Sequence, residues 1–149
     1  MKLLYDHVCL TVADVDRSVE FYCRHFDFKP ARRDNPVSGS SVEQLTSIVG
    51  AKLQAAFVTS DDLVLEFIQF IDKQSDLPVA APNQIGALHL GFVVEDVRKA
   101  YEELSAQGVH FYSEPVYHAR RGNYSVMATD PDGIPIELRE QRALQTMPN

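Results

Sequence analysis

The sequence has few cysteines, few basic residues and no long apolar run, and each shortage excludes a class of protein. Cys9 and Cys23 are too few and wrongly spaced for a disulfide framework or a CxxC motif. Lys and Arg total 14 against 21 Asp and Glu, so the chain carries a charge of −7 and repels nucleic acid. The longest apolar stretch, residues 87–94, is far shorter than the roughly 20 residues that a membrane span needs.

The remaining composition is that of a globular protein. Of the 149 residues, 45% are hydrophobic and 23% are charged, which excludes disorder, collagen and a coiled coil. The length suits one domain, residues 1–149, or two small modules that share a core. A charged residue follows the start too early for a signal-peptide core, so we expect a cytoplasmic protein.

An internal repeat organises the chain. Residues 7–15 and residues 89–97 match at an offset of 82, with a histidine at the start and an aspartate near the end of each. Each segment alternates apolar and other residues as a strand does, and then reaches a carboxylate suited to capping a helix. Helical spacing predicts helices over about residues 16–26 and 96–107, the second of them closed by Gly108.

A second pair of related segments completes each half. Residues 61–67 match residues 132–138 at an offset of 71, with Glu66 and Glu137 in corresponding strand positions. Further strands are predicted at residues 28–33, 53–59, 63–70, 109–113, 123–129 and 134–140. The sequence therefore predicts an α+β fold of two βαβββ modules, about residues 1–72 and 85–140, joined by a linker over about 73–84.

Residues 30–50 form an insert in the first half that has no counterpart of equal length in the second. Its Pro, Gly and Ser content is typical of a loop, from which Ser41 is predicted to cap a short helix that ends near Ile48 and is closed by Gly50. The insert is either a lid over a pocket or a surface excursion.

Strand alternation places four polar residues on the strand faces turned away from the helices. Because Val8, Leu10 and Val12 face the first helix, His7 faces the opposite side. The same argument applies to Glu66, His89 and Glu137. Two imidazoles and two carboxylates suit one divalent transition-metal ion, namely Zn, Ni, Fe, Co or Mn. A single strand histidine is more often a core residue than a ligand, but recurrence at matched positions favours a metal site.

These residues and motifs resemble the vicinal oxygen chelate superfamily. The resemblance rests on His7, residues 12–22 and 65–67, His89 and residues 130–138. This superfamily includes glyoxalase I, methylmalonyl-CoA epimerase, extradiol dioxygenases and the fosfomycin- and bleomycin-resistance proteins. It implies an open cup-like mixed sheet around the metal, and a homodimer is expected. In the glyoxalase branch four ligands correspond to His7, Glu66, His89 and Glu137, whereas epimerases usually have Gln at the position of Glu66.

The resemblance implies chemistry on a small substrate that binds the metal through adjacent oxygens, with Glu137 or Glu66 as the base. Thr11 stands where glyoxalase I enzymes commonly have a glutathione-binding Arg, so a glutathione-based substrate is not implied. Arg120 and Arg121 either bind an anionic group instead or form a solvated loop, and Tyr5 and Cys9 are expected beside His7. The alternatives are an extradiol-type dioxygenase, which would use His7, His89 and Glu137 alone, and a drug-binding resistance protein.

Overall fold

The computed structural model describes residues 1–61, 63–75 and 77–140. The chain divides into two compact units, the first spanning Met1–Leu77 and the second starting at Pro78. This division lies inside the predicted linker. Among the described residues, no helix is long and apolar enough to cross a membrane.

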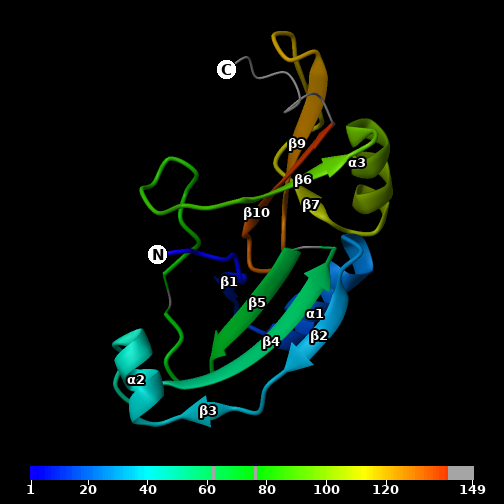
Figure 1. The fold of residues 1–149 in the computed structure, drawn as a ribbon. Helices are drawn as coiled ribbons and strands as arrows, with labels where there is room; N and C mark the ends of the chain where they lie inside the picture. Colours follow the sequence, from blue (N-terminus) through cyan, green and yellow to red (C-terminus); the bar gives the residue numbers. More distant parts are fainter. Residues whose placement is uncertain (62, 76, 141–149) are drawn as a thin grey trace. The chain divides into compact units, whose positions relative to one another are not determined.

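The first unit contains one five-stranded mixed sheet. Its strands and helices are, in chain order, β1 (Val8–Thr11), α1 (Val15–His25), β2 (Lys29–Arg33), β3 (Val37–Ser38), α2 (Ser40–Thr46), β4 (Lys52–Ser60) and β5 (Leu63–Phe70). The sheet order is β1-β5-β4-β2, and β3 also pairs with β4 (Figure 1). The β1–β5 pair is parallel and the other pairs are antiparallel.

The second unit repeats this arrangement. It contains β6 (Leu90–Val94), α3 (Val97–Ala106), β7 (His110–Phe111), β8 (Val116–His118), β9 (Asn123–Thr129) and β10 (Pro135–Glu140). The sheet order is β6-β10-β9-β7, with β8 on β9, and the β6–β10 pair is parallel. The predicted α+β fold with a repeated strand–helix–strand–hairpin order is thus confirmed; β3 and β8 are short strands that the sequence did not predict.

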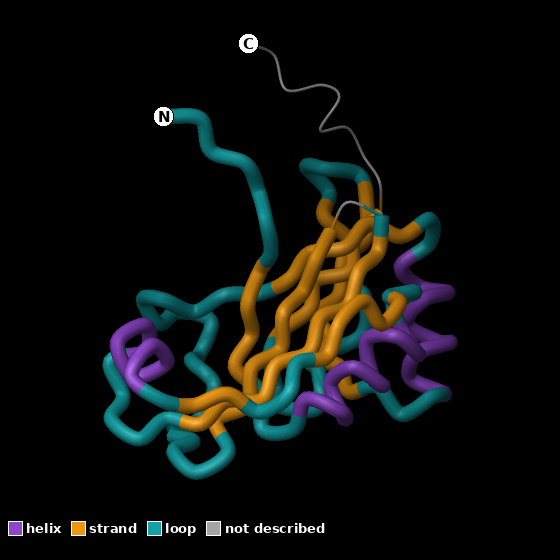
Figure 2. Tube along the Cα trace, turned by 60° about the horizontal axis from the view of Figure 1, so that its bottom comes forward, coloured by secondary structure: helices purple, strands orange, loops and turns teal. Residues whose placement is uncertain are grey.

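Each long helix packs on one face of its sheet (Figure 2). In the first unit Leu10, Leu65 and Phe67 are buried on the face towards α1, where Tyr22 stacks on Phe67 with ring centroids 5.1 Å apart. In the second unit the buried strand residues are Leu90, Ile136 and Leu138, and those of α3 are Val97 and Leu104. Burial of each large side chain contributes about 1.5–3 kcal/mol. The buried set confirms the predicted alternation, so the residues between these positions face away from the helices.

The two long helices begin and end as their sequences indicate. The carboxylates of Asp14 and Asp96 each accept two backbone N–H groups of the first helical turn. Past the ends of these helices, Asp27 and Gly108 adopt left-handed backbone conformations with φ of 55° and 87°. The position of Gly108 agrees with the sequence prediction, and Asp27 takes the corresponding place after α1.

The insert is more regular than its composition suggested. Its first residues belong to β2 and β3, which pair with β4. The prediction that Ser41 caps the short helix was wrong, because α2 starts at Ser40 and Gly39 occupies the cap position. Gly39 has a φ of 106°, which a glycine adopts without strain, so the chain turns into the helix before Ser41 is reached. After the helix, the Gly50 N–H donates to the Glu43 carboxylate over 2.8 Å.

Candidate functional site

The first unit brings His7 and Glu66 together on the face opposite α1. His7 immediately precedes β1, and Glu66 lies in the middle of β5 between buried Leu65 and Phe67. Because β1 and β5 are parallel with Cys9 opposite Glu66, the histidine side chain reaches across to the carboxylate. His7 Nε2 lies 2.9 Å from Glu66 Oε2.

A second carboxylate contacts the other nitrogen of the same imidazole. Asp6 Oδ2 lies 2.6 Å from His7 Nδ1. A neutral imidazole has one N–H donor, so it can donate to only one of the two carboxylates. The other nitrogen then faces a carboxylate with its lone pair, unless a proton or a metal ion lies between them. Asp6 is not among the predicted site residues, although a carboxylate beside a predicted histidine ligand is a signal for it.

The second unit holds the corresponding pair, His89 and Glu137. His89 immediately precedes β6 and Glu137 lies within β10. His89 Nε2 is 3.9 Å from Glu137 Oε2, a longer contact than in the first unit. The side chain of Glu137 is 23% exposed and that of His89 is 54% exposed. Both units therefore present one imidazole and one carboxylate from corresponding strands.

Donor chemistry and spacing in these pairs fit a divalent metal ion. Two atoms bound to one ion at about 2.0–2.2 Å lie roughly 3–3.5 Å apart for bond angles between 90° and tetrahedral. The His7–Glu66 separation of 2.9 Å is close to this spacing, and the His89–Glu137 separation of 3.9 Å is longer. In the described part of the chain, no group of three or more His, Cys, Asp or Glu side chains gathers around one point.

The residues opposite the two glutamates differ between the units. Cys9 faces Glu66, and burial of the thiol, the charge of Glu66 and a hydrogen bond to it raise the pKa of Cys9 to about 12. The raised pKa disfavours the thiolate, so Cys9 is a poor nucleophile at neutral pH. Gly91 takes the corresponding place in the second unit, where an added Cβ would lie 3.9 Å from Glu137 Oε2.

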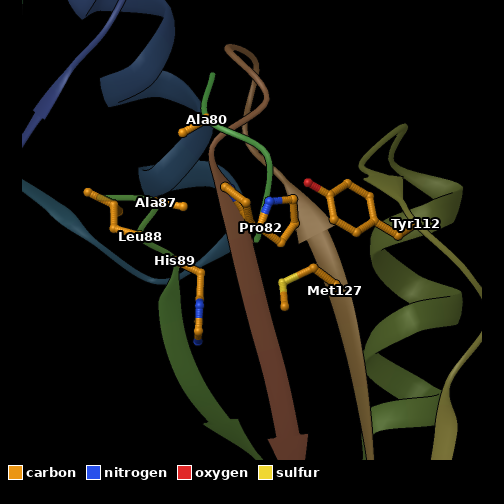
Figure 3. Close-up of a pocket in the computed structure, with 8 residues that line it drawn as sticks. Ala80, Pro82, Ala87, Leu88, His89, Tyr112 and Met127 are labelled. Carbon is orange, nitrogen blue, oxygen red and sulfur yellow. The ribbon is translucent and has the colours of Figure 1, made fainter. Parts of the chain in front are cut away.

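A small cavity of about 60 Å³ adjoins His89 in the second unit (Figure 3). Met127, which pairs with Glu137 in the sheet register, lines it from β9. The other lining residues are mostly apolar: Ala80, Pro82, Ala87, Leu88, Tyr112 and Pro135. An apolar hollow beside one polar side chain suits a small organic group rather than a second ion.

The five residues predicted to bind substrate separate into two groups. Tyr5, Cys9 and Thr11 precede or belong to β1, at the alternate positions that include His7; the Tyr5 hydroxyl donates to the Val64 carbonyl over 3.2 Å. Arg120 and Arg121 are exposed in the turn that precedes β9, whereas Met127, opposite Glu137, lies in the second half of that strand. The structure thus places Cys9 opposite Glu66 and the Tyr5 hydroxyl at Val64, whereas Thr11 pairs with Ile68, two positions beyond Glu66, and the two arginines lie in a turn away from Glu137.

Comparison with known proteins identifies one family. The family model described as Glyoxalase/Bleomycin resistance protein/Dioxygenase superfamily matches residues 4–138. Glyoxalase I of Saccharomyces cerevisiae is 34% identical over 146 residues, which cover 91% of this chain and 44% of the yeast protein. The chain therefore spans less than half the length of this curated relative.

Solved structures show the same fold. A glyoxalase family protein from Bacillus cereus superposes with a TM-score of 0.80 at 23% identity, covering 96% of this chain and 97% of its own. Glyoxalase I from Zea mays superposes with a TM-score of 0.68 at 20% identity, covering 92% of this chain and 44% of its own. A fosfomycin resistance protein from Listeria monocytogenes superposes with a TM-score of 0.65 at 16% identity, covering 97% and 98%.

Proposed function

The chain belongs to the Glyoxalase/Bleomycin resistance protein/Dioxygenase superfamily, and from this membership we propose that it is a divalent-metal-dependent lyase or isomerase of the glyoxalase type. His7 and Glu66 supply two ligands of the ion, and His89 and Glu137 supply two more. The ion is Zn, Ni, Fe, Co or Mn. The yeast relative is a glyoxalase I, which supports this choice within the superfamily.

One observation carries the proposal: His7 lies between two carboxylates. With Asp6 at Nδ1 and Glu66 at Nε2, a neutral imidazole faces two carboxylates with only one N–H group. A cation at Nε2 resolves this conflict, while Asp6 keeps the proton on Nδ1 and orients the ring. The recurrence of a histidine–glutamate pair in the second unit supports the same interpretation.

The reaction follows from the donor set. An ion held by His7, Glu66, His89 and Glu137 would act as a Lewis acid for a substrate with two adjacent oxygens and would stabilise negative charge on them. Glu137 or Glu66 accepts a proton from the neighbouring carbon of the substrate. Glu137 is the better candidate because its contact with His89 is the longer of the two. The apolar hollow beside His89 holds a small substituent of the substrate.

We extend the proposal to a homodimer. The chain covers 44% of the yeast and of the maize glyoxalase I chains. Two copies of this chain are therefore about as long as one chain of either relative. The outer strands of each sheet, such as β1 and β6, have one unpaired edge within their own sheet and would be covered in such an assembly. Light scattering on the metal-loaded protein used in the assay below is expected to give twice 16.7 kDa.

An assay of metal-reconstituted protein tests the function. The protein is stripped with a chelator, reloaded with each of the five metals, and offered methylglyoxal–thiol hemithioacetals, acyl-CoA epimers and catechols. We expect metal-dependent isomerisation or lyase activity that Glu137→Gln or Glu66→Gln reduces by roughly 100-fold or more. Glu95→Gln, an exposed change outside both pairs, is the matched control.

Two other outcomes would contradict the proposal. Catechol-dependent oxygen uptake that survives Glu66→Gln would identify a dioxygenase with three protein ligands. A protein that takes up no metal but binds an aromatic drug would identify a sequestration protein.

A further inference from the structure

A row of side chains crosses the first sheet beside the His7–Glu66 pair. Cys9 of β1 pairs with Glu66 of β5, Glu66 with Phe57 of β4, and Phe57 with Arg32 of β2. Residues opposite one another in register lie on the same face of a sheet. The row therefore ends in an arginine on the face that carries the predicted metal ligands.

A β-bulge puts Arg32 on that face. In β2, Pro30 pairs with Val58 and Arg32 with Phe57, so Ala31 is an extra residue without a partner in the register. Without it, Arg32 would lie opposite Ala56, which is buried on the face towards α1. Bulges often redirect a side chain next to an active site. Here the bulge turns Arg32, a cationic residue, to the face that carries Glu66.

The neighbouring arginine shows the contrast. Arg33 pairs with Ala56 and turns to the helix side, where its guanidinium binds both carboxylate oxygens of Asp16. Two adjacent arginines thus lie on opposite faces of the edge strand. The charge of Arg33 is matched by a bidentate carboxylate, as is typical of a structural ion pair.

The Arg32 guanidinium is held in place yet has donors to spare. Its Cζ lies 4.0 Å from the centre of the Phe57 ring, and that ring makes an edge contact with His7 at 6.0 Å between centroids. Asp34 Oδ1 lies 3.1 Å from the Arg32 Nε, and the Arg32 side chain is 61% exposed. A guanidinium carries five N–H donors, of which Nε has one and the two Nη groups have four.

We propose that Arg32 binds an anionic group of the substrate, a carboxylate or a phosphate, through its Nη groups. This inference rests on the proposed function, because it takes the substrate oxygens to be at His7 and Glu66. Adjacent strands are about 4.8 Å apart, so the α-carbons of Glu66 and Arg32, two strands apart, are separated by roughly 10 Å. The substrate is accordingly a short acid whose chelating oxygens and anionic group are a few bonds apart.

Hydroxamates test this, because they chelate metal ions through two neighbouring oxygens. Three probes of equal chain length end in a carboxylate, a phosphonate or a neutral amide, and their affinities for the zinc-loaded full chain are measured by calorimetry. We expect wild type to bind at least one anionic probe about tenfold more tightly than the amide. The tighter of the two anionic probes tells a carboxylate substrate from a phosphate. Arg32→Gln should remove the preference and leave amide binding unchanged, whereas Arg33→Gln should retain it.

The outcomes separate the two proposals. Amide binding that His7→Ala abolishes, combined with no preference for either anionic probe in wild type, would overturn the role of Arg32 and leave the metal site standing. A preference that is lost in Arg33→Gln and kept in Arg32→Gln would show that Arg33 binds the anionic group. This result would also overturn the role of Arg32. Failure of all three probes to bind would overturn the proposed function, and this inference with it.

Discussion

At the scale of single residues, His7 is where the chemistry of the chain concentrates. Its two ring nitrogens face Asp6 and Glu66, and its edge meets the Phe57 ring. A carboxylate on the nitrogen remote from a metal fixes the tautomer and makes the imidazole a better ligand. The residue before His89, which corresponds to Asp6 before His7, is Leu88, and its side chain has no carboxylate. We therefore predict that the first unit contributes more than the second to the affinity for the proposed ion.

Replacing Asp6 tests this asymmetry. We expect Asp6→Ala to weaken zinc affinity by about tenfold, because the Nδ1 proton loses its acceptor and the ring its orientation. Leu88→Ala, the change at the corresponding position of the second unit, serves as the control and should leave affinity close to wild type. Both are measured by competition with a chelating dye. Equal affinities for wild type and Asp6→Ala would show that the Asp6 contact has no role in metal binding.

Residue-scale prediction from sequence succeeded where the signal was local and repeated. Alternation along a strand predicts that His7, Glu66, His89 and Glu137 lie on the faces opposite the helices without knowledge of the fold. Leu65 and Ile136, the neighbours of the two glutamates, are buried on the helix sides as this alternation requires. Arg32 could not be placed in this way. The extra residue Ala31 reverses the alternation of β2, and nothing in the local sequence marks the bulge.

At the scale of elements, the unit that recurs is a strand followed by a capped helix. Asp14 and Asp96 occupy the same position before α1 and α3 and bind the same two backbone N–H groups. The helix bounds expected from the sequence differ from Val15–His25 and Val97–Ala106 by about one residue at each end. The short helix of the insert was placed less well, since a glycine with a positive φ starts it and leaves no side-chain signal.

The cap of α3 gives a pH-dependent prediction. Hydrogen bonds from the backbone N–H groups of Lys99 and Arg98 lower the pKa of Asp96 from its ordinary 3.8. Because the folded-state pKa lies below the unfolded one, the carboxylate stabilises the folded chain above about pH 4, and this contribution is lost as pH falls through the folded pKa.

We therefore expect Asp96→Ala to lower the urea midpoint of unfolding at pH 7 and to lower it much less at pH 3, as measured by circular dichroism. Glu95→Ala, one residue earlier and exposed, is the control and should leave the midpoint nearly unchanged. A difference between wild type and Asp96→Ala that is the same at both pH values would show that the charged cap does not stabilise α3.

At the scale of the whole molecule, duplication is the organising fact. Two units with the same order of strands and the same parallel first pair each present one histidine and one glutamate. The repeat offsets predicted this organisation from sequence, because duplicated units keep their buried positions and turns in register. Assembly of the units could not be predicted from sequence alone, since alternation and capping describe contacts within a unit.

The central claim is that both histidine–glutamate pairs bind the same ion. The most direct measurement is the zinc content per chain, by mass spectrometry of the dialysed protein, in wild type and in two double variants, His7→Ala/Glu66→Ala and His89→Ala/Glu137→Ala. One zinc per chain in wild type and nearly none in either double variant is the predicted result. Two zinc ions per chain, or one retained after either pair is removed, would contradict it.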